Sequence, residues 1–279
     1  MEITLKGRTA VVTGGGAGIG RAIVDAFGAL GARIAIAEVD PAKVERLKAE
    51  LAAKGIDALV AGVDVCQPDQ VAAFFQAVEA RFGGIDVLVN NVGHHLGLVK
   101  TLEAMTNEEI DALYAINLRQ MFIVTRAALP LLRRSGRGGS IIGVSSIEGF
   151  RGNPYNAAYT AFKHAVTGFT KAMALELAAD NIRVNCIAPE TTDSEQVPVS
   201  LLVKEKYRND PVLSLPLGRF GKPSDHAGAA VYFATDMSAW VTGTVAHVDG
   251  GGLAAAGFQR TPDGQWTIGP VVTDNIFNA

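Results

Sequence analysis

Tyr159 and Lys163 stand four residues apart in a helix-like run that reads Y-T-A-F-K. Residues i and i+4 share one face of a helix, so the phenol and the ammonium point into the same space. A phenol with a pKa of about 10 is a poor acid–base group at neutral pH, and a neighbouring ammonium favours its ionised form. The pair could therefore exchange a proton with a substrate hydroxyl. The same spacing also occurs on ordinary amphipathic helices, so the pair alone does not decide the chemistry.

Polar residues also follow two apolar runs that have the character of buried strands. Ser145 and Ser146 come directly after Ile141–Val144, and the turn-like Asn90–Gly93 follows an earlier run. Ligands bind at the carboxyl edge of parallel sheets, although serine, asparagine and glycine also close turns. Asn117 lies inside an otherwise apolar helical pattern, where asparagine can serve a ligand or simply bond its own backbone.

A glycine-rich turn occupies Thr13–Gly20, where the residues read T-G-G-G-A-G-I-G. It comes directly after the apolar run Thr9–Val12 and before the helix-like Arg21–Phe27. Glycine tolerates positive φ and has no Cβ, so the backbone there can approach a diphosphate closely. The following helix directs unpaired N–H groups and the positive end of its dipole at that anion. The turn therefore predicts a dinucleotide site, although tight strand-to-helix packing also requires glycine.

Composition excludes several classes of protein. A hydrophobic content of 48% and a mean hydropathy of +0.22 suit a parallel sheet that is buried on both faces, with an oligomer interface as a second contributor. The net charge of −3 provides no basic field for nucleic acid or for an anionic membrane. No apolar run approaches the roughly 20 residues that span a bilayer, and the N-terminus is expected to carry no signal peptide. Cys66 and Cys186 lack metal-ligand spacing, so two reduced thiols and a cytoplasmic location are expected.

Strand-like and helical patterns alternate along the chain. Strands are expected at Ala10–Thr13, Arg33–Ala37, Ala58–Val63, Val87–Val89, Ile141–Val144, Arg183–Ile187 and Val245–Val248. Helical patterns lie between them at Pro41–Lys54, Pro68–Phe82, Asn107–Leu132, Ala157–Ala178 and Ser224–Ala234. This rhythm predicts an α/β fold, namely a single-domain, Rossmann-type, doubly wound parallel sheet with helices on both faces.

One dinucleotide-binding and catalytic domain is expected over residues 1–252, because no linker or repeat interrupts the rhythm. Residues 190–221 break it with three prolines and predict a mobile segment that covers the substrate. The extension over residues 253–279 should be ordered at a subunit interface, since its large apolar side chains favour burial. These side chains are Phe258, Trp266, Ile268, Val271, Val272, Ile276 and Phe277. Within the extension, Pro262–Gly264 predicts a turn.

From about Gly7 to Gly252 the chain resembles the compact short-chain dehydrogenase/reductase family. The matching motifs are Thr13–Gly20, Asp64-Val65, N-N-V-G at Asn90–Gly93, Asn117-Leu118, Ser145-Ser146, Y-T-A-F-K at Tyr159–Lys163, R-V-N-C-I-A-P at Arg183–Pro189 and V-D-G-G at Val248–Gly251. In that family the catalytic serine lies 13 residues before the tyrosine, which selects Ser146 over Ser145.

The resemblance implies specific roles. Tyr159 would be the general acid–base, and Ser146 would bond and stabilise the substrate oxygen. Lys163 would lower the tyrosine pKa and bond the nicotinamide ribose, while Asn117 would hold a water that links Lys163 to solvent. The residues assigned to the cofactor are Gly14, Gly18, Ile19, Gly20, Glu38, Asp64, Val65, Asn90, Gly93, Tyr159, Lys163, Pro189, Thr192 and Ser194.

Glu38 ends the second expected strand, where a carboxylate accepts hydrogen bonds from a ribose 2′-OH and repels a 2′-phosphate. We therefore expect NAD rather than NADP, unless Glu38 is only a solvated strand end. Some positions depart from the family pattern. Glu190 stands where the family has glycine, Ser194 aligns with a threonine and Phe162 replaces a small serine. His94 and His95 could border the substrate. A metal site is not expected there, because the sequence offers no third ligand beside them.

These observations predict an NAD-dependent oxidoreductase that interconverts a secondary alcohol and its ketone. Apolar residues of the covering segment favour an apolar or alicyclic substrate; they are Val197, Val199, Leu201, Leu202, Val203 and Leu213. The alternatives are a 3-oxoacyl thioester reductase, which requires a basic patch for an acidic carrier protein, and a dinucleotide-sensing regulator without catalysis. The resemblance implies a homotetramer or a dimer.

Overall fold

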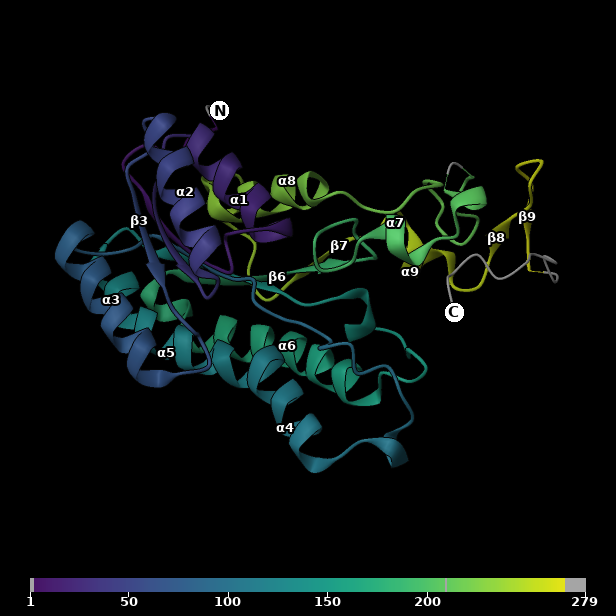
Figure 1. Cartoon of the computed structure of the whole chain (residues 1–279). Helices are drawn as coiled ribbons and strands as arrows, with labels where there is room; N and C mark the ends of the chain where they lie inside the picture. Colours follow the sequence, from purple (N-terminus) through teal and green to yellow (C-terminus); the bar gives the residue numbers. More distant parts are fainter. Residues whose placement is uncertain (1–2, 209, 269–279) are drawn as a thin grey trace.

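A parallel sheet of seven strands forms the centre of the molecule, with the order β3-β2-β1-β4-β5-β6-β7 (Figure 1). The computed structural model describes residues 3–208 and 210–268. The sheet strands are β1 Thr9–Thr13, β2 Arg33–Glu38, β3 Ala58–Gly62, β4 Val87–Asn90, β5 Gly139–Val144, β6 Ile182–Pro189 and β7 Val245–Val248. Each expected strand is present within a few residues of its predicted bounds, and the doubly wound α/β fold is confirmed.

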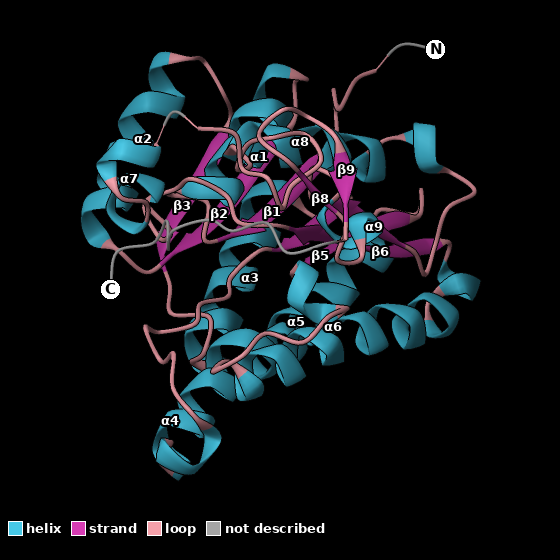
Figure 2. Ribbon diagram, turned by 90° about the vertical axis from the view of Figure 1, so that its right-hand side faces the viewer, coloured by secondary structure: helices cyan, strands magenta, loops and turns pink. Residues whose placement is uncertain are grey.

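Helices cover both faces of the sheet. They are α1 Gly18–Ala29, α2 Pro41–Ala53, α3 Pro68–Phe82, α4 Asn107–Tyr114, α5 Gln120–Arg134, α6 Ala157–Glu176, α7 Val199–Leu202, α8 Pro223–Ala234 and α9 Gly252–Ala255. In Figure 2, α1, α2 and α8 lie above the sheet and α3, α5 and α6 lie below it. None of the helices within the described ranges has the length and apolar character needed to cross a membrane.

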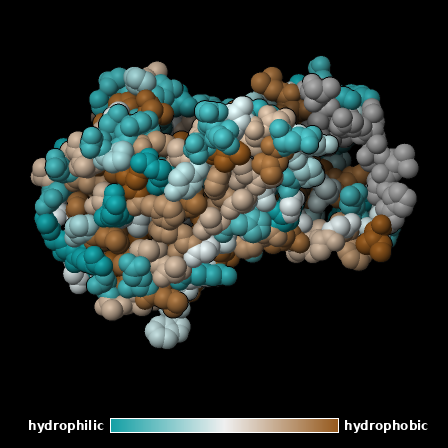
Figure 3. All heavy atoms as spheres, turned by 90° about the horizontal axis from the view of Figure 1, so that it is seen from below, coloured by the Kyte–Doolittle hydropathy of each residue, from teal (hydrophilic) through white to brown (hydrophobic). Residues whose placement is uncertain are grey.

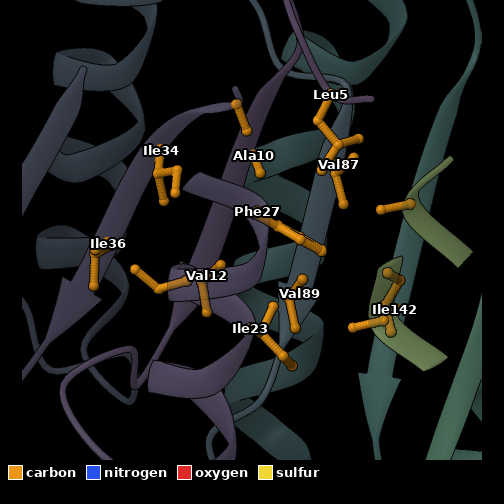
Figure 4. Packing of buried hydrophobic residues seen from close by; sticks show 14 of the residues in the cluster. Leu5, Ala10, Val12, Ile23, Phe27, Ile34, Ile36, Val87, Val89 and Ile142 are labelled. Atoms are coloured by element: carbon orange, nitrogen blue, oxygen red, sulfur yellow. The ribbon is translucent and has the colours of Figure 1, made fainter. Parts of the chain in front are cut away.

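The two faces of the sheet bury separate hydrophobic clusters. On the α1 and α8 side, Phe27 and Ile23 of α1 pack on Val12 of β1 and Val89 of β4 (Figure 4). On the opposite side, α3, α5 and α6 pack on the other face of the same strands. Strand β1 is buried along its whole length. The strands therefore need apolar side chains in both directions, which accounts for their continuous valine and isoleucine runs.

The chain changes its winding direction at β1. Strand β1 pairs with β2 on one side and with β4 on the other, both in parallel. In doubly wound sheets, a crevice opens beyond the carboxyl ends of the strands at this point. The glycine turn follows β1, Glu38 ends β2, and Ser145 follows β5, so the sheet order brings these distant parts of the sequence to one edge.

The predicted helix Asn107–Leu132 is present without interruption, but one of its turns is not α-helical. The structure has α4, which begins at a capping box of Thr106 and Glu109, then a five-residue π-helical turn at Ala115–Arg119, and then α5. A π turn inserts an extra residue into the helical ladder, and such turns are frequent at functional sites. Here the turn contains Asn117, whose side chain is fully buried.

The segment over residues 190–221 leaves the sheet after β6 and returns to the same point before α8. Its two ends are joined by an isolated parallel bridge between Thr192 and Gly221. The backbone N–H of Asp193 donates to the carbonyl of Gly221 at 2.9 Å, and the N–H of Gly221 donates to the carbonyl of Thr191 at 2.9 Å. The segment is therefore a closed loop with a fixed base, and it contains α7.

Part of the C-terminal extension forms a two-stranded antiparallel hairpin, β8 Gln259–Arg260 and β9 Trp266–Thr267. The turn predicted at Pro262–Gly264 is present, with Gly264 at φ +87°. The guanidinium of Arg260 lies 4.7 Å from the ring centroid of Trp266, whose side chain is half exposed. The order predicted for Val271, Val272, Ile276 and Phe277 concerns positions outside the described residues.

Substitution of alanine for Gly20 should lower the stability of the folded protein. A Cβ at this position would lie 2.2 Å from the backbone oxygen of Gly14, which cannot move without opening the turn. We expect a loss of roughly 1–3 kcal/mol in the free energy of unfolding, the usual range for overpacking. The measurement is urea unfolding of Gly20→Ala, with Gly228→Ala as the matched helical control.

The control position lies in α8 and has no atom within 4 Å of an added Cβ. Gly228→Ala should therefore be neutral or should stabilise the protein by up to about 1 kcal/mol, because alanine favours the helix. Equal stability of the two variants would show that the turn tolerates a side chain at residue 20.

Candidate active site

A cleft of about 670 Å³ opens at the carboxyl edge of the sheet. The glycine turn and Glu38 line it, together with the loop after β4, the end of β5, the start of α6 and the segment after Pro189. This volume lies within the usual range for sites that bind a small molecule or a cofactor. The residues at its two ends have different chemistry, and each end is built by different strands.

The glycine turn forms one end of the cleft. Gly14 and Gly18 adopt positive φ values of +63° and +54°, and Ala17 caps α1 without a side-chain hydrogen bond. The first N–H groups of α1 are therefore available to a ligand. The side-chain amide of Asn91 donates to the carbonyls of Thr13 and Gly14 at 3.0 and 3.2 Å, which fixes the turn from the β4 side. A glycine-rich cradle, open at a helix N-terminus, fits the diphosphate of a dinucleotide.

Glu38 faces this turn from the end of β2. Its side chain is 7% exposed, and its carboxylate accepts the N–H of Gly16 at 2.8 Å and the N–H of Asp40 at 3.1 Å. Glu38 is thus not a solvated strand end. Its carboxylate lines the cleft beside the glycine turn, where the ribose of a dinucleotide would be recognised.

The Tyr159 and Lys163 pair lies at the other end of the cleft, on the first turns of α6. Ser145 and Ser146 follow β5 and both line the cleft, but the hydroxyl of Ser145 donates to the carbonyl of Lys163 at 2.8 Å. The Lys163 ammonium donates to the carbonyl of Val144 at 3.3 Å and lies 5.5 Å from the centroid of the Tyr159 ring. The two neighbouring serines therefore differ in use, since the hydroxyl of Ser145 bonds the backbone of α6 and that of Ser146 does not.

Asn117 holds the loop after β4 against the π turn. Its side-chain oxygen accepts the N–H of His94 at 3.0 Å, and its amide donates to the carbonyls of His94 and Leu113 at 2.8 and 2.9 Å. A Cβ on Gly93 would lie 2.7 Å from Lys163 Nζ and 3.1 Å from Asn117 Oδ1. The close approach of these polar groups therefore requires glycine at residue 93.

Burial controls the proton affinities at this end of the cleft. Desolvation raises the pKa of Tyr159, the negative charge of Glu148 raises it further, and a hydrogen bond with Ser146 opposes them. The lowering of the tyrosine pKa by Lys163, which the resemblance implies, stays a prediction. Desolvation lowers the pKa of Lys163 to about 8. At neutral pH Tyr159 is consequently a proton donor, the form that carbonyl reduction needs.

The remaining residues predicted for cofactor binding divide into two groups. Gly14, Gly18, Ile19, Gly93, Pro189, Thr192 and Ser194 line the cleft. Four others lie behind its lining. Asp64 accepts the N–H of Cys66 at 2.9 Å, Asn90 donates to the Thr125 hydroxyl at 2.9 Å, and Val65 and Gly20 are parts of the packed backbone.

The sequence reasoning did not single out Glu148, which lines the cleft, or Arg151, which pairs with two of its carboxylates. Glu148, two positions after Ser146, accepts a hydrogen bond from the Ser146 hydroxyl. Arg151 approaches the carboxylates of Glu148 at 3.4 Å and Glu190 at 2.7 Å. The spacing of Glu148 from Ser146 could have indicated the hydrogen bond between these two residues. The ion pair of Arg151 with Glu190 joins the loop after β5 to the end of β6 and depends on the pairing of those strands.

Comparison with known proteins agrees with this geometry. A family model described as Enoyl-(Acyl carrier protein) reductase matches residues 14–252. A solved short-chain type dehydrogenase/reductase from Mycobacterium marinum superposes with a TM-score of 0.82 at 33% identity, covering 90% of this chain and 97% of that one. The chain belongs to the short-chain dehydrogenase/reductase family. Members of this family bind a nicotinamide dinucleotide, and the chain is accordingly an oxidoreductase of this family.

Among its relatives in the short-chain dehydrogenase/reductase family, the chain is similar to enzymes of different names. It is 38% identical to a 3-oxoacyl-[acyl-carrier-protein] reductase of Thermotoga maritima, covering 88% of this chain and 98% of the relative. It is 35% identical to a 3alpha-hydroxysteroid dehydrogenase of Mediterraneibacter gnavus, with 90% and 98% covered. A solved 3-ketoacyl-(acyl-carrier-protein) reductase from Brucella melitensis, complexed with NADH, superposes with a TM-score of 0.79 at 32% identity, covering 89% and 99%.

Replacement of Tyr159 by phenylalanine should remove turnover and leave the affinity for the dinucleotide almost unchanged. The phenol is expected to transfer the proton, and general acid–base groups contribute about 10²–10⁴-fold to the rate. Steady-state kinetics and NADH binding by fluorescence measure the two effects separately. Tyr232→Phe, on α8 across the sheet, is the matched control; residual turnover of Tyr159→Phe within threefold of that control would remove Tyr159 from the chemistry.

Proposed function

We propose that the protein transfers a hydride reversibly between a nicotinamide dinucleotide and a substrate carbon. This atom is the carbinol carbon of a secondary alcohol or the carbonyl carbon of the corresponding ketone. The observation that carries this proposal is the placement of Ser146, Tyr159 and Lys163 at one end of a single cleft, with the glycine turn at its other end. An acid–base group, an oxygen-bonding hydroxyl and a diphosphate cradle are the parts that such a reaction requires from the protein.

In this mechanism the substrate oxygen lies between Ser146 and Tyr159. The Ser146 hydroxyl must turn from Glu148 toward that oxygen, where it stabilises the developing negative charge. Tyr159 gives its proton to the oxygen in reduction and accepts it in oxidation. The buried Lys163 ammonium, with a pKa near 8, can resupply that proton. Asn117 bonds the loop after β4 and so holds this side of the cleft in place. The cofactor, when bound, supplies or accepts the hydride.

We propose NAD as the preferred dinucleotide. Glu38 is the support for this choice, because its carboxylate lines the cleft and is held there by two backbone N–H groups. A carboxylate in that place accepts hydrogen bonds from a ribose 2′-OH and repels a 2′-phosphate. A relative in this family was solved with NADH bound, which agrees with the proposal.

For the substrate, a 3-oxoacyl thioester now has more support than the apolar or alicyclic alcohol expected from the sequence. Several of the most similar relatives are named 3-oxoacyl-[acyl-carrier-protein] reductases. The apolar residues of the covering segment also contribute less than expected. Of that set only Val197 lines the cleft, while Val203 is buried and Leu201 is 70% exposed.

A free alcohol or ketone is the second candidate, and the charges around the cleft favour it. Lys43 pairs with Glu195 at 2.7 Å, and Arg151 pairs with Glu190 at 2.7 Å. Cations already paired with carboxylates make a poor docking patch for an acidic carrier protein. The 3alpha-hydroxysteroid dehydrogenase among the relatives shows that close similarity extends to an enzyme named for a free alcohol.

A direct comparison of substrates tests the two candidates. Reduction of acetoacetyl-coenzyme A, followed by NADH absorbance, should exceed reduction of cyclic, steroidal and aliphatic ketones if the thioester is the substrate class. A preference for any free ketone by a factor of ten or more would select the second candidate. Binding of NADH without turnover of either group would revive the non-catalytic regulator.

The Glu38→Ala variant should lose its preference for NAD over NADP. Both the acceptor for the 2′-OH and the charge that repels a 2′-phosphate disappear, so the ratio of the two catalytic efficiencies should fall roughly tenfold, equivalent to about 1.4 kcal/mol. Glu45→Ala, an exposed position on α2, controls for the loss of a nearby charge. An unchanged ratio in Glu38→Ala would exclude Glu38 from cofactor selection.

We also propose that the protein is cytoplasmic and forms a homotetramer or a dimer. Both cysteines are free thiols, which suits a reducing compartment. The α4–α6 side of the molecule exposes aromatic groups in pairs: Tyr114 beside Phe162 and Phe122 beside Phe169, with ring centroids 5.7 and 5.3 Å apart. Figure 3, which views the molecule from below, shows apolar atoms across the middle of this face. A second copy of the chain would bury them.

Truncation after Gly257 tests whether the extension belongs to that assembly. We expect a smaller oligomer, a lower melting temperature and a higher Michaelis constant, because β8 and β9 would be lost together with apolar side chains. Truncation after Ile268 keeps the hairpin and separates its contribution from that of the last eleven residues. If size, melting temperature and Michaelis constant are unchanged in both variants, the extension has no part in assembly or in the cleft.

A further inference from the structure

Three charged side chains form a connected network beside the reacting end of the cleft. The guanidinium of Arg151 lies between the carboxylates of Glu148 and Glu190, at 3.4 and 2.7 Å. The two carboxylate side chains are only 15% and 7% exposed, whereas Arg151 is 39% exposed at the rim. Glu190 also accepts the N–H and the hydroxyl of Thr191 at 2.8 and 3.2 Å. We refer to Glu148, Arg151 and Glu190 as the carboxylate network.

The network touches the reacting groups directly. The Ser146 hydroxyl donates to Glu148, and both Glu148 and Glu190 line the cleft. The negative charge of Glu148 also contributes to the raised pKa of Tyr159, which places that charge within electrostatic reach of the phenol. Because Ser146 and Tyr159 mark the position of the substrate oxygen, the nicotinamide ring must lie beside the same groups when hydride is transferred.

The charges of the network do not cancel. Two carboxylates and one guanidinium leave one net negative charge in a largely desolvated place. At the same end of the cleft, the buried Lys163, whose pKa is lowered to about 8, is a cation that opposes part of this charge. Burial lowers the pKa values of His94 and His95, so their imidazoles add no further positive charge at pH 7. Charges interact strongly over short distances in such surroundings because solvent screening is weak. The nicotinamide ring is positively charged when oxidised and neutral when reduced, so only the oxidised ring gains from this charge.

We propose that the carboxylate network stabilises the oxidised cofactor relative to the reduced cofactor at the active site. This inference rests on the proposed function, since it requires a nicotinamide in this cleft. When an alcohol is oxidised, the carbinol C–H bond breaks and its hydride passes to the oxidised ring. The hydroxyl proton passes to the oxygen of Tyr159, whose own proton has first passed to solvent, and this leaves the ketone and the reduced cofactor. Glu148 and Glu190 take no part in bond breaking and act as positioning charges.

The proposal is tested by the dissociation constants of both cofactor forms, without substrate. In Glu148→Gln the remaining Arg151–Glu190 pair is neutral, so NAD⁺ should bind more weakly while NADH changes little. The ratio of the NADH constant to the NAD⁺ constant should fall roughly tenfold, as expected for one unit charge at short range. In Arg151→Gln, two unopposed carboxylates remain, and the ratio should rise.

The ratio should therefore change in opposite directions in the two variants. This distinguishes an effect of charge from general damage to the site, which would weaken the binding of both cofactor forms alike. Glu176→Gln provides the matched control, because this exposed residue lies on the same helix as Tyr159 but roughly 25 Å along it. Equal ratios in the wild type and both network variants would overturn the proposal. Failure of the wild type to bind either cofactor form would instead overturn the proposed function, and binding with a shifted ratio but no turnover would support the network alone.

Discussion

Burial of the Lys163 ammonium is the constraint on which the rest of the active site depends. A cation removed from water is costly unless polar groups meet it. The carbonyl of Val144 at the end of β5 meets this one, and Ser145 ties the same turn of α6 to the strand by donating to the Lys163 carbonyl. Gly93 lacks a side chain because the ammonium occupies that space. The positions of Ser146 and Tyr159 follow from this anchored contact between strand and helix.

A second regularity concerns the carboxylates of the cleft. Glu38, Glu148 and Glu190 each follow or end a strand of the parallel sheet, where backbone N–H groups and hydroxyls are free to donate. Glu38 receives the N–H groups of the glycine turn and of its own loop, and Glu190 receives those of Thr191. The edge of the sheet therefore holds negative charge at both ends of one cleft. In the proposed function the two ends face different parts of the cofactor, namely a ribose at one end and the reacting ring at the other.

Much of the fold and part of the site could be predicted from the sequence. The strands were predictable because burial on both faces demands apolar runs, as in Ala10–Val12 of β1 and Val87–Val89 of β4. The glycine turn and the Tyr159–Lys163 pair could be predicted because each depends only on the spacing of residues that are close in sequence. The π turn at Asn117 could not be found this way, since tertiary bonds to His94 stabilise it and the helical periodicity continues through it. The link from Arg151 to Glu190 joins the loop after β5 to the residue after β6, which are distant in sequence, so only the sheet pairing reveals it.

The closed base of the segment over residues 190–221 has an evolutionary consequence. Because the Thr192–Gly221 bridge fixes where the segment leaves and rejoins the body, the chain between these points can change in length or composition without moving β6 or α8. The entropic cost of a longer loop grows only slowly with its length. Insertions and deletions there can alter what the cleft admits while the proton-transfer groups keep their places. New specificities can thus arise in a lineage through this one interval, with little cost to folding.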